Sequence, residues 1–432
     1  MKSSETDILV IGGGPAGTTF ATLMAQRGWK VALLEKGEHP RFHIGESLLP
    51  MNLPILERLG VLDQVRDIGI VKRGADFTQG NSGTEHQTFY FDQALGDSPG
   101  HAFEVTRSEF DGLLFANCRS SGVDAHEGVR ATEVRDLGNG RHRVESMSAD
   151  GESLEWTARF VVDASGRDAL LASKNGWKRR NARHASAAIF GHFHGVRRRP
   201  RDDEGNISIY WFDHGWVWMI PLPDDVMSIG VVAYPQYLKT RKVSLDDFLM
   251  STLKGVSEIG DRLSGAQLIR PAQATGNYSY FSSRSSGSGF LLIGDAYAFI
   301  DPVFSSGVYL AMSSAENAVP VAEAWLSGNR VRYYRSRRKY QRRLKQGIST
   351  FSWFIYRFTT PAMSHLLNNP DNRMKVVQAV TSMLAGDVYS NWTVRWRLMI
   401  FKGIYFVTSV RNWRGVQDNR RKRRAGVGVD LA

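Results

Sequence analysis

The sequence predicts an α/β fold: a Rossmann-type nucleotide-binding domain, an antiparallel-sheet domain and a helical C-terminal region. Three observations support this prediction. A glycine-rich turn at Gly12–Gly17 lies between a buried strand and a helix. Residues 180–285 alternate apolar and polar side chains and are rich in β-formers. From about residue 310 onward, helical patterns, aromatic residues and basic residues dominate.

The first element is a βαβ unit at residues 6–35. An apolar run at Asp7–Ile11 precedes the glycine turn, a helical segment follows it, and a second apolar run ends at Glu35, 23 residues after Gly12. Such a turn lets the backbone approach a pyrophosphate closely, and the acid accepts hydrogen bonds from ribose hydroxyls. The predicted contacts of this unit are Gly12, Gly14, Pro15, Ala16, Gly17, Glu35 and Lys36.

Two later strands are predicted to complete the same domain. Phe160–Asp163 and Phe290–Gly294 are apolar runs that end at small residues and the acids Asp163 and Asp295. A helix from about Ser306 to Ala324 follows, and its N-terminus would present free backbone amides. We therefore expect three regions: residues 1–180 with 285–325 as the nucleotide-binding domain, 181–284 as the antiparallel-sheet substrate domain, and 326–432 as the helical region with a basic tail at 411–432.

Charge and composition exclude several classes. The formal charge is +12, but nine cations lie at 330–345 and five at 420–424, so the excess is local and nucleic-acid binding is not predicted. We find no run of about 18 apolar residues that would span a bilayer. One cysteine, Cys118, excludes an intrachain disulfide, and with no secretion signal we expect a cytoplasmic protein. His192 and His194 lack a third ligand at metal-like spacing, so no metal site is predicted.

Four further motifs narrow the prediction. They are Arg41–Pro50 (RFHIGESLLP), Lys72 in VKRGA, Trp216–Pro221 (WVWMIP) and Phe299–Gly307 (FIDPVFSSG). With the glycine turn, the chain resembles flavin-dependent halogenases of phenols and pyrroles, within the p-hydroxybenzoate hydroxylase-like FAD-dependent monooxygenases. The resemblance covers residue 6 to about 390. It implies a flavoprotein fold of the glutathione-reductase type and an enzyme of secondary-metabolite biosynthesis.

The resemblance implies a reaction and a catalytic residue. Reduced FAD and O2 would oxidise chloride or bromide to hypohalous acid, which would reach Lys72 beside an aromatic substrate. A lysine can hydrogen-bond this oxidant or, once deprotonated, capture the halogen as a haloamine. The residues alone would favour a surface lysine beside Arg73.

A partition between flavin and substrate is also implied. Trp216 and Trp218 lie two apart, so in a strand they point to the same face. With Ile220 and Pro221 they would separate the flavin from the substrate. The alternative is a pair of core tryptophans.

The resemblance places halide binding at the start of the predicted helix, on Pro302, Ser305, Ser306 and Gly307. Backbone amides there would hold a halide without a full opposing charge. Phe304 stands where tryptophan halogenases carry glutamate, which favours a phenol or pyrrole substrate over indole. The further FAD contacts implied are Arg41, Ser47, Arg107, Asp163, Gly294, Asp295 and Gly307.

Partners follow from what the sequence lacks. We see one dinucleotide fingerprint, so a separate NAD(P)H-dependent flavin reductase is expected. The aromatic substrate is either free or bound to a carrier protein, and the cations at 330–345 either dock an acidic carrier or form a solvated helix face. The aromatic residues that follow are candidates for core packing or for substrate contacts: Phe351, Trp353, Phe354, Tyr356 and Phe358.

Two competing functions remain open. A flavin hydroxylase, or a reductase of the geranylgeranyl-reductase type, would share the FAD motifs without using halide. A non-catalytic protein that binds nucleic acid, an acidic partner or a membrane surface would use the basic segments alone. The sequence does not indicate which oligomeric state the protein adopts.

Overall fold

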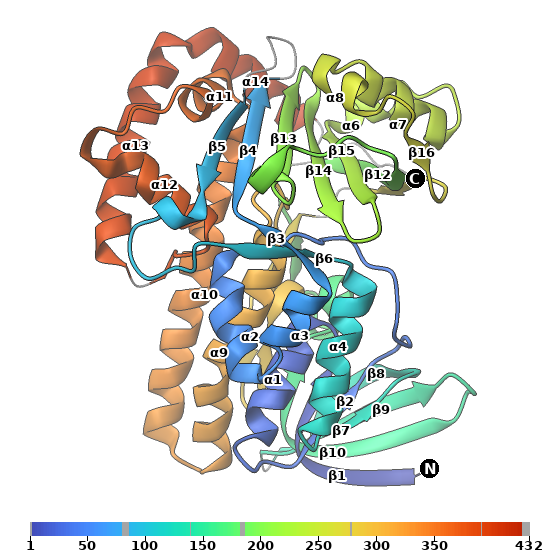
Figure 1. Ribbon diagram of the computed structural model, residues 1–432. Helices are drawn as coiled ribbons and strands as arrows, with labels where there is room; N and C mark the ends of the chain where they lie inside the picture. Colours follow the sequence, from blue (N-terminus) through green and yellow to red (C-terminus); the bar gives the residue numbers. More distant parts are fainter. Residues whose placement is uncertain are drawn as a thin grey trace.

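A computed structural model of the chain describes residues 2–79, 86–138, 140–181, 186–276, 279–389 and 391–425. Its lower half in Figure 1 is built on a mixed sheet whose parallel strands run in the order β20-β10-β1-β2-β7. Parallel strands covered by helices are typical of a nucleotide-binding α/β domain. The strands of this sheet are β1 (Lys2–Ile11), β2 (Val31–Leu34), β7 (Asp124–His126), β8 (Val129–Asp136), β9 (His142–Ser148), β10 (Ser153–Asp163), β19 (Ser286–Gly287) and β20 (Phe290–Leu292).

Helices cover this sheet. The predicted helix after residue 305 is present and packs against both the first helix of the chain and the long helix that follows it. The helices of this half are α1 (Pro15–Ala25), α2 (Leu53–Leu59), α3 (Leu62–Asp67), α4 (Arg107–Ser120), α5 (Leu170–Lys174), α9 (Ser306–Leu326) and α10 (Arg330–Phe358). Because α10 spans both halves, it joins the nucleotide-binding domain to the C-terminal helices (Figure 1).

The upper half contains the antiparallel sheet that the sequence predicts. Its order is β16-β12-β15-β14-β13-β4-β5, and β13 pairs in parallel with β4. Two of its strands therefore come from residues 74–90, well before the segment 181–284. The strands are β4 (Gly74–Gln79), β5 (His86–Tyr90), β12 (Ala187–His194), β13 (Ile207–Phe212), β14 (Gly215–Leu222), β15 (Val226–Ala233), β16 (Gln267–Leu268) and β17 (Gln273–Thr275).

Short sheets and two groups of helices complete the fold. One short sheet pairs β3 (Gly69–Lys72) with β6 (Ala102–Val105), and the other contains β11 (Lys178–Arg180), β18 (Tyr280–Ser282) and β21 (Ala298–Phe299). Three helices flank one side of the upper sheet: α6 (Pro235–Leu238), α7 (Leu245–Lys254) and α8 (Ser257–Arg262). The C-terminal group contains α11 (Pro361–Asn368), α12 (Val376–Leu384), α13 (Trp392–Arg411) and α14 (Trp413–Ala425).

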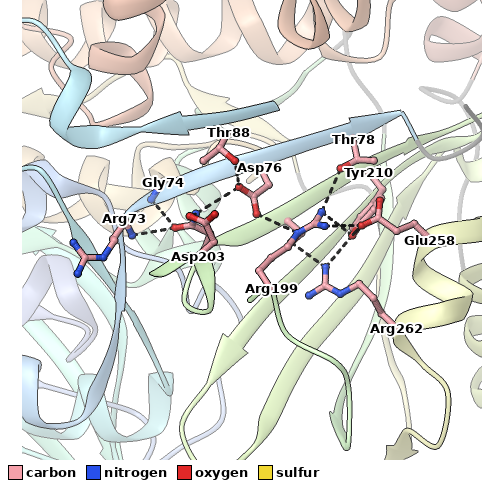
Figure 2. Close-up of polar contacts among 12 residues, drawn as sticks. Arg73, Gly74, Asp76, Thr78, Thr88, Arg199, Asp203, Tyr210, Glu258 and Arg262 are labelled. Atoms are coloured by element: carbon pink, nitrogen blue, oxygen red, sulfur yellow. Dashed lines mark hydrogen bonds and ion pairs between the residues drawn. The ribbon is translucent and has the colours of Figure 1, made fainter. Parts of the chain in front are cut away.

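A buried group of charged side chains ties α8 to the upper sheet (Figure 2). We call Asp76, Arg199, Tyr210, Glu258 and Arg262 the arginine cluster. Arg199 lies between two carboxylates, with Nε 3.4 Å from Asp76 Oδ2 and Nη1 2.7 Å from Glu258 Oε1. Arg262 donates to the Tyr210 hydroxyl, which donates to Glu258. The pairing offsets the cost of burying these charges between helix and sheet.

Among the described helices, none is long and apolar enough to cross a membrane. Residues 426–432 of the predicted basic tail lie outside the described residues. The part of the tail that is described continues α13 into α14.

Candidate active site

The glycine turn between β1 and α1 contains glycines that the protein's own packing requires and one glycine beside free space. Gly12 has φ +107°, and a Cβ there would lie 2.3 Å from the Ala164 carbonyl oxygen, while a Cβ on Gly17 would lie 1.9 Å from the Gly12 oxygen. The protein's own backbone requires both glycines. Gly14 differs, because the nearest described atom to its Cβ would be Arg41 Nη2 at 3.7 Å. The space beside Gly14 is therefore available to a ligand.

This space belongs to a cavity of about 950 Å³ between the two halves of the molecule. Its size is at the upper end of the range for ligand pockets. The sequence-predicted residues that line it are Gly12, Gly14, Pro15, Ala16, Glu35, Lys36, Arg41, Ser47, Arg107, Trp216, Trp218, Ile220, Asp295, Pro302, Ser305 and Gly307. The predicted residues outside this lining are Gly17, Lys72, Asp163, Pro221, Gly294 and Ser306.

Glu35 organises the loop around the glycine turn. Its Oε2 accepts from the Gly13 amide at 2.6 Å and its Oε1 from the Gly37 amide at 2.9 Å. Each carboxylate oxygen can accept a second hydrogen bond, so Glu35 can still receive a ribose hydroxyl. The glycine turn, the acid and the free space at Gly14 together fit an adenine dinucleotide such as FAD.

Arg107 fixes the opposite wall of the cavity. Its guanidinium makes a bidentate contact with the buried Asp111 at 2.8 and 2.9 Å, and Nη1 donates to the Ile44 and Gly45 carbonyls. Burial raises the pKa of Asp295 to about 6, against the opposing charge of Arg107. The charge of Arg107, followed by burial, lowers the pKa of His43 to about 4. Near neutral pH the wall therefore presents fixed donors and a carboxylate that can bind polyol hydroxyls.

Asp163, predicted from the sequence to contact FAD, accepts hydrogen bonds from the protein's own backbone instead. Its Oδ1 accepts from the Ser165 amide at 3.0 Å and its Oδ2 from the Leu171 amide at 2.7 Å. The carboxylate is fully buried and lies outside the cavity lining. Asp163 thus holds the loop that follows β10 in place and does not reach the cavity.

The segment before α9 forms a second polar end of the cavity. Ser305 adopts a left-handed conformation with φ +54°, and α9 begins at Ser306. Ser305 and Gly307 line the cavity, while the Ser306 side chain is fully buried and its Oγ has no hydrogen-bond partner among the described residues. Free amides at the start of a 21-residue helix, beside an unpaired hydroxyl, are suited to a small anion.

The two tryptophans lie on β14 as the spacing predicts. Trp216, Trp218 and Ile220 share one face and line the cavity, and Pro221 occupies the alternate position outside the lining. The Trp218 ring fills the space over Gly230 of β15, where a Cβ would lie 2.2 Å from the indole. Trp216 also lines a much smaller pocket of about 20 Å³ with Phe358. Trp216 therefore borders both spaces, and Trp218 borders the larger one.

Lys72 ends β3 and is almost completely buried, which rules out a surface lysine. Its Nζ donates to Ser47 Oγ at 2.7 Å and to the Leu48 carbonyl at 3.1 Å. It also lies 5.4 Å from the centre of the Phe91 ring. Burial lowers the pKa of Lys72, and the nearby Glu104 opposes this shift. Because Ser47 lines the cavity, Lys72 connects to it through a single hydroxyl.

Two buried carboxylates complete this group, and neither is among the site residues predicted from the sequence. Ser47 Oγ donates to Glu104 Oε1 at 3.1 Å, and Glu46 Oε1 pairs with His192 Nε2 at 2.7 Å. Burial raises the pKa of the Glu104 carboxyl to about 8. In both glutamates Oε2 is buried without a hydrogen-bond partner among the described residues. We call Lys72, Ser47, Glu46, Glu104 and His192 the lysine cluster.

A sequence signal for these two residues exists. Glu46 stands inside the GESLLP motif beside Ser47, and Glu104 lies three residues before Arg107. The pairing of β3 with β6, which sets Lys72 opposite Ala102, brings Glu104 near the lysine. His192 is the partner of Glu46. From the sequence alone it is an ordinary strand histidine.

Comparisons with known proteins relate the chain to FAD-binding proteins and to halogenases. The FAD binding domain family matches residues 5–340. A 1H-pyrrole-2-carbonyl-[peptidyl-carrier protein] chlorinase of Pseudomonas fluorescens is 31% identical over 90% of this chain and 91% of its own length. A tryptophan 2-halogenase of Chondromyces crocatus is 37% identical over 75% of this chain, which spans 62% of that relative. The structure of the myxobacterial chondrochloren halogenase is 32% identical with a TM-score of 0.78, covering 89% of this chain and 90% of that one.

Proposed function

The chain belongs to the flavin-dependent halogenases, FAD-binding enzymes that act on aromatic substrates, and from this premise we propose that it halogenates an electron-rich phenol or pyrrole ring. Chloride or bromide is the proposed halogen source, and Lys72 the residue that delivers the halogen. The main support for the proposal is the position of the buried Lys72, which donates to the Ser47 hydroxyl at the cavity wall. The same cavity is lined by the two tryptophans and by the start of α9.

FAD fits the cavity because Gly14 leaves space, Glu35 keeps acceptor capacity, and Arg41, Arg107 and Asp295 supply charge along the walls. When bound and reduced, FAD supplies two electrons with which O2 oxidises halide to hypohalous acid, and the second oxygen atom leaves as water. We assign the halide to the amides of Ser306 and Gly307 and the Ser306 hydroxyl.

Trp216 and Trp218 have a separating role in this proposal. A bulky wall admits a small oxidant and keeps an aromatic ring away from the flavin, so halogenation is favoured over hydroxylation. Phe304 is buried and packs against Phe354 and Phe358, so no carboxylate stands at this position. A site without that carboxylate suits rings that are already activated, as phenols and pyrroles are.

Lys72 then positions the oxidant beside the ring. As an ammonium it donates a hydrogen bond to hypohalous acid, and as an amine it takes the halogen and releases water. Its lowered pKa brings the second form within reach. The ring gains the halogen and loses a proton, which returns to the Lys72 nitrogen of the haloamine or forms water with the hydroxide of hypohalous acid.

The enzyme is tested with a panel of phenols and pyrroles, free and carrier-bound, plus FAD, NADH, a separate flavin reductase and bromide. We expect a product whose mass shows bromine in place of hydrogen. Addition of oxygen alone would assign the chain to the hydroxylases of this fold and contradict the proposal.

FAD binding has its own test in Gly14→Val. The added side chain points into the space that the pyrophosphate would fill, so flavin titration should show loss of binding while the protein stays folded. Gly403→Val on α13, where a Cβ meets nothing within 4 Å, is the control and should bind FAD normally. Unchanged binding by Gly14→Val would remove the glycine turn from the cofactor site.

A carrier-bound substrate and a cytoplasmic setting remain part of the proposal. The only cysteine, Cys118, is buried and free, which suits a reducing compartment. On α10 the side chains of Arg335, Arg338 and Arg342 are exposed on one face and could dock an acidic carrier.

Charge reversal tests carrier docking. Arg335→Glu with Arg338→Glu should slow turnover of carrier-bound substrate and leave free substrate unaffected, and higher salt should slow the wild type similarly. Arg241→Glu with Lys242→Glu makes the same charge change on an exposed loop and is the control. Turnover indifferent to salt and to the α10 change would make this face a solvated helix surface.

A further inference from the structure

Helix α13 presents apolar side chains on two opposite faces. Val394, Leu398, Phe401 and Tyr405 are buried against the neighbouring helices. On the other side, Trp392, Met399, Phe406 and Val410 follow one another at helical spacing and are 57 to 68% exposed. Figure 1 shows α13 on the outer side of the helical region. The outward row, which Trp413 at the start of α14 extends, is the outer stripe of α13.

The outer stripe is unusual because folding does not require it. Burial of the opposite face already anchors the helix, so exposed aromatic and aliphatic side chains gain nothing from intramolecular packing. Single exposed apolar residues are normal, whereas a contiguous row over about 30 Å of helix marks an interaction surface.

The flanks of the stripe carry only positive charge. Arg395, Arg397, Lys402, Arg411 and Arg414 lie within residues 391–417, which contain no acidic residue. Arg397 Nε donates to the Met374 carbonyl, which ties the loop that precedes α12 to α13. The nearest acid of that loop, Asp371, is paired with Arg373. The ligand of this surface should therefore be apolar at its centre and anionic at its edges.

We propose that the outer stripe of α13 docks the protein onto an anionic lipid surface. Trp392 and Trp413 stand at the two ends of the stripe, and tryptophan is the residue enriched at membrane–water interfaces. Projecting side chains insert between lipid headgroups without a complementary pocket, and adjacent cations then pair with lipid phosphates. A second copy fits less well, because a two-fold contact would set the cationic flanks against each other. The inference concerns the location of the enzyme and is independent of its reaction.

The full chain, loaded with FAD, is sedimented with phosphatidylcholine vesicles with or without phosphatidylglycerol at about 0.1 M salt. We expect binding to the anionic vesicles and much weaker binding to the neutral ones. Met399→Glu with Phe406→Glu should lower the vesicle partition coefficient by about tenfold or more, because two apolar side chains no longer insert. FAD titration and circular dichroism verify that this variant is folded.

A matched control separates the stripe from the basic helix α10. Val331→Glu with Tyr334→Glu changes two equally exposed apolar residues of α10 and adds the same charge. If α13 binds the lipid, this control variant should keep most of its affinity for the anionic vesicles. A larger loss in the α10 variant, absence of vesicle binding in the wild type, or self-association that only the α13 variant abolishes would each overturn the proposal. The last result would assign the stripe to a second copy of the chain.

Discussion

The lysine cluster and the arginine cluster are two buried groups of charges in one molecule, and they differ in what their cations can do. Arg199 contacts two carboxylates directly at 3.4 and 2.7 Å, and an arginine stays protonated at any ordinary pH. Lys72 lies 3.9 Å from Glu104 and reaches it through Ser47. A buried lysine can lose its proton, so of the two cations only Lys72 can change its charge.

The two clusters also differ in their position relative to the cavity. The arginine cluster joins α8 to the upper sheet and lies outside the cavity lining (Figure 2). The lysine cluster contributes Glu46 and Ser47 to that lining. The comparison indicates that burial of charge by itself does not mark a catalytic site. A titratable cation next to a cavity does, whereas permanently charged cations in closed pairs hold the fold together.

Removal of Lys72 should have the largest effect on the reaction. Lys72→Ala should reduce halogenated product by more than about a thousandfold, roughly 4 kcal/mol in barrier, because the oxidant loses both positioning and activation. Lys72→Arg should restore little, since a guanidinium cannot form a haloamine. Product is quantified by mass spectrometry. Near wild-type halogenation by Lys72→Ala would remove the lysine from the reaction.

Removal of Arg199 should have the opposite profile. Arg199→Ala leaves Asp76 and Glu258 buried without their shared cation, so we expect a loss of about 3 kcal/mol in the free energy of unfolding. The halogenation rate per folded molecule should stay within about twofold, as the cluster lies outside the cavity lining. Denaturant titration measures the stability. Arg135→Ala, at the exposed pair with Glu133, is the control and should show no measurable change.

Removal of the Glu104 charge should change the reaction only at high pH. With a pKa of about 8, Glu104 is neutral below that pH, so Glu104→Gln should match the wild type there. Above pH 8 the wild-type carboxylate ionises and keeps Lys72 protonated, whereas the variant's lysine loses its proton at lower pH. The pH profiles of product formation should therefore coincide below about pH 8 and diverge above it. Divergence at pH 6 would contradict this charge state.

Much of the site could be predicted because its motifs are local in sequence. The strand, turn and helix at residues 6–35 follow from periodicity and glycine spacing, and alternation along β14 sets Trp216 and Trp218 on one face. The same alternation explains why Pro221, also predicted at the wall, lies outside the cavity.

Contacts between distant segments could not be predicted in the same way. Glu104 meets Lys72 only because β6 pairs with β3, some thirty residues earlier, and local patterns carry no register between such strands. Strands β4 and β5 likewise join the upper sheet from an early part of the chain. Among the candidate aromatic residues, Phe351, Phe354 and Phe358 are buried. Their helical spacing is compatible with burial, but burial depends on which segments pack against the helix.

In the proposed reaction, oxidant formation and halogen transfer occur at different places, and Lys72 is needed only for halogen transfer. The direct test follows flavin reoxidation by O2 and bromide incorporation in the same sample, for the wild type and for Lys72→Ala. We expect reoxidation at a similar rate in both proteins, while brominated product forms only in the wild type. Loss of both activities together in a folded, FAD-binding Lys72→Ala protein, or retention of both, would contradict this expectation.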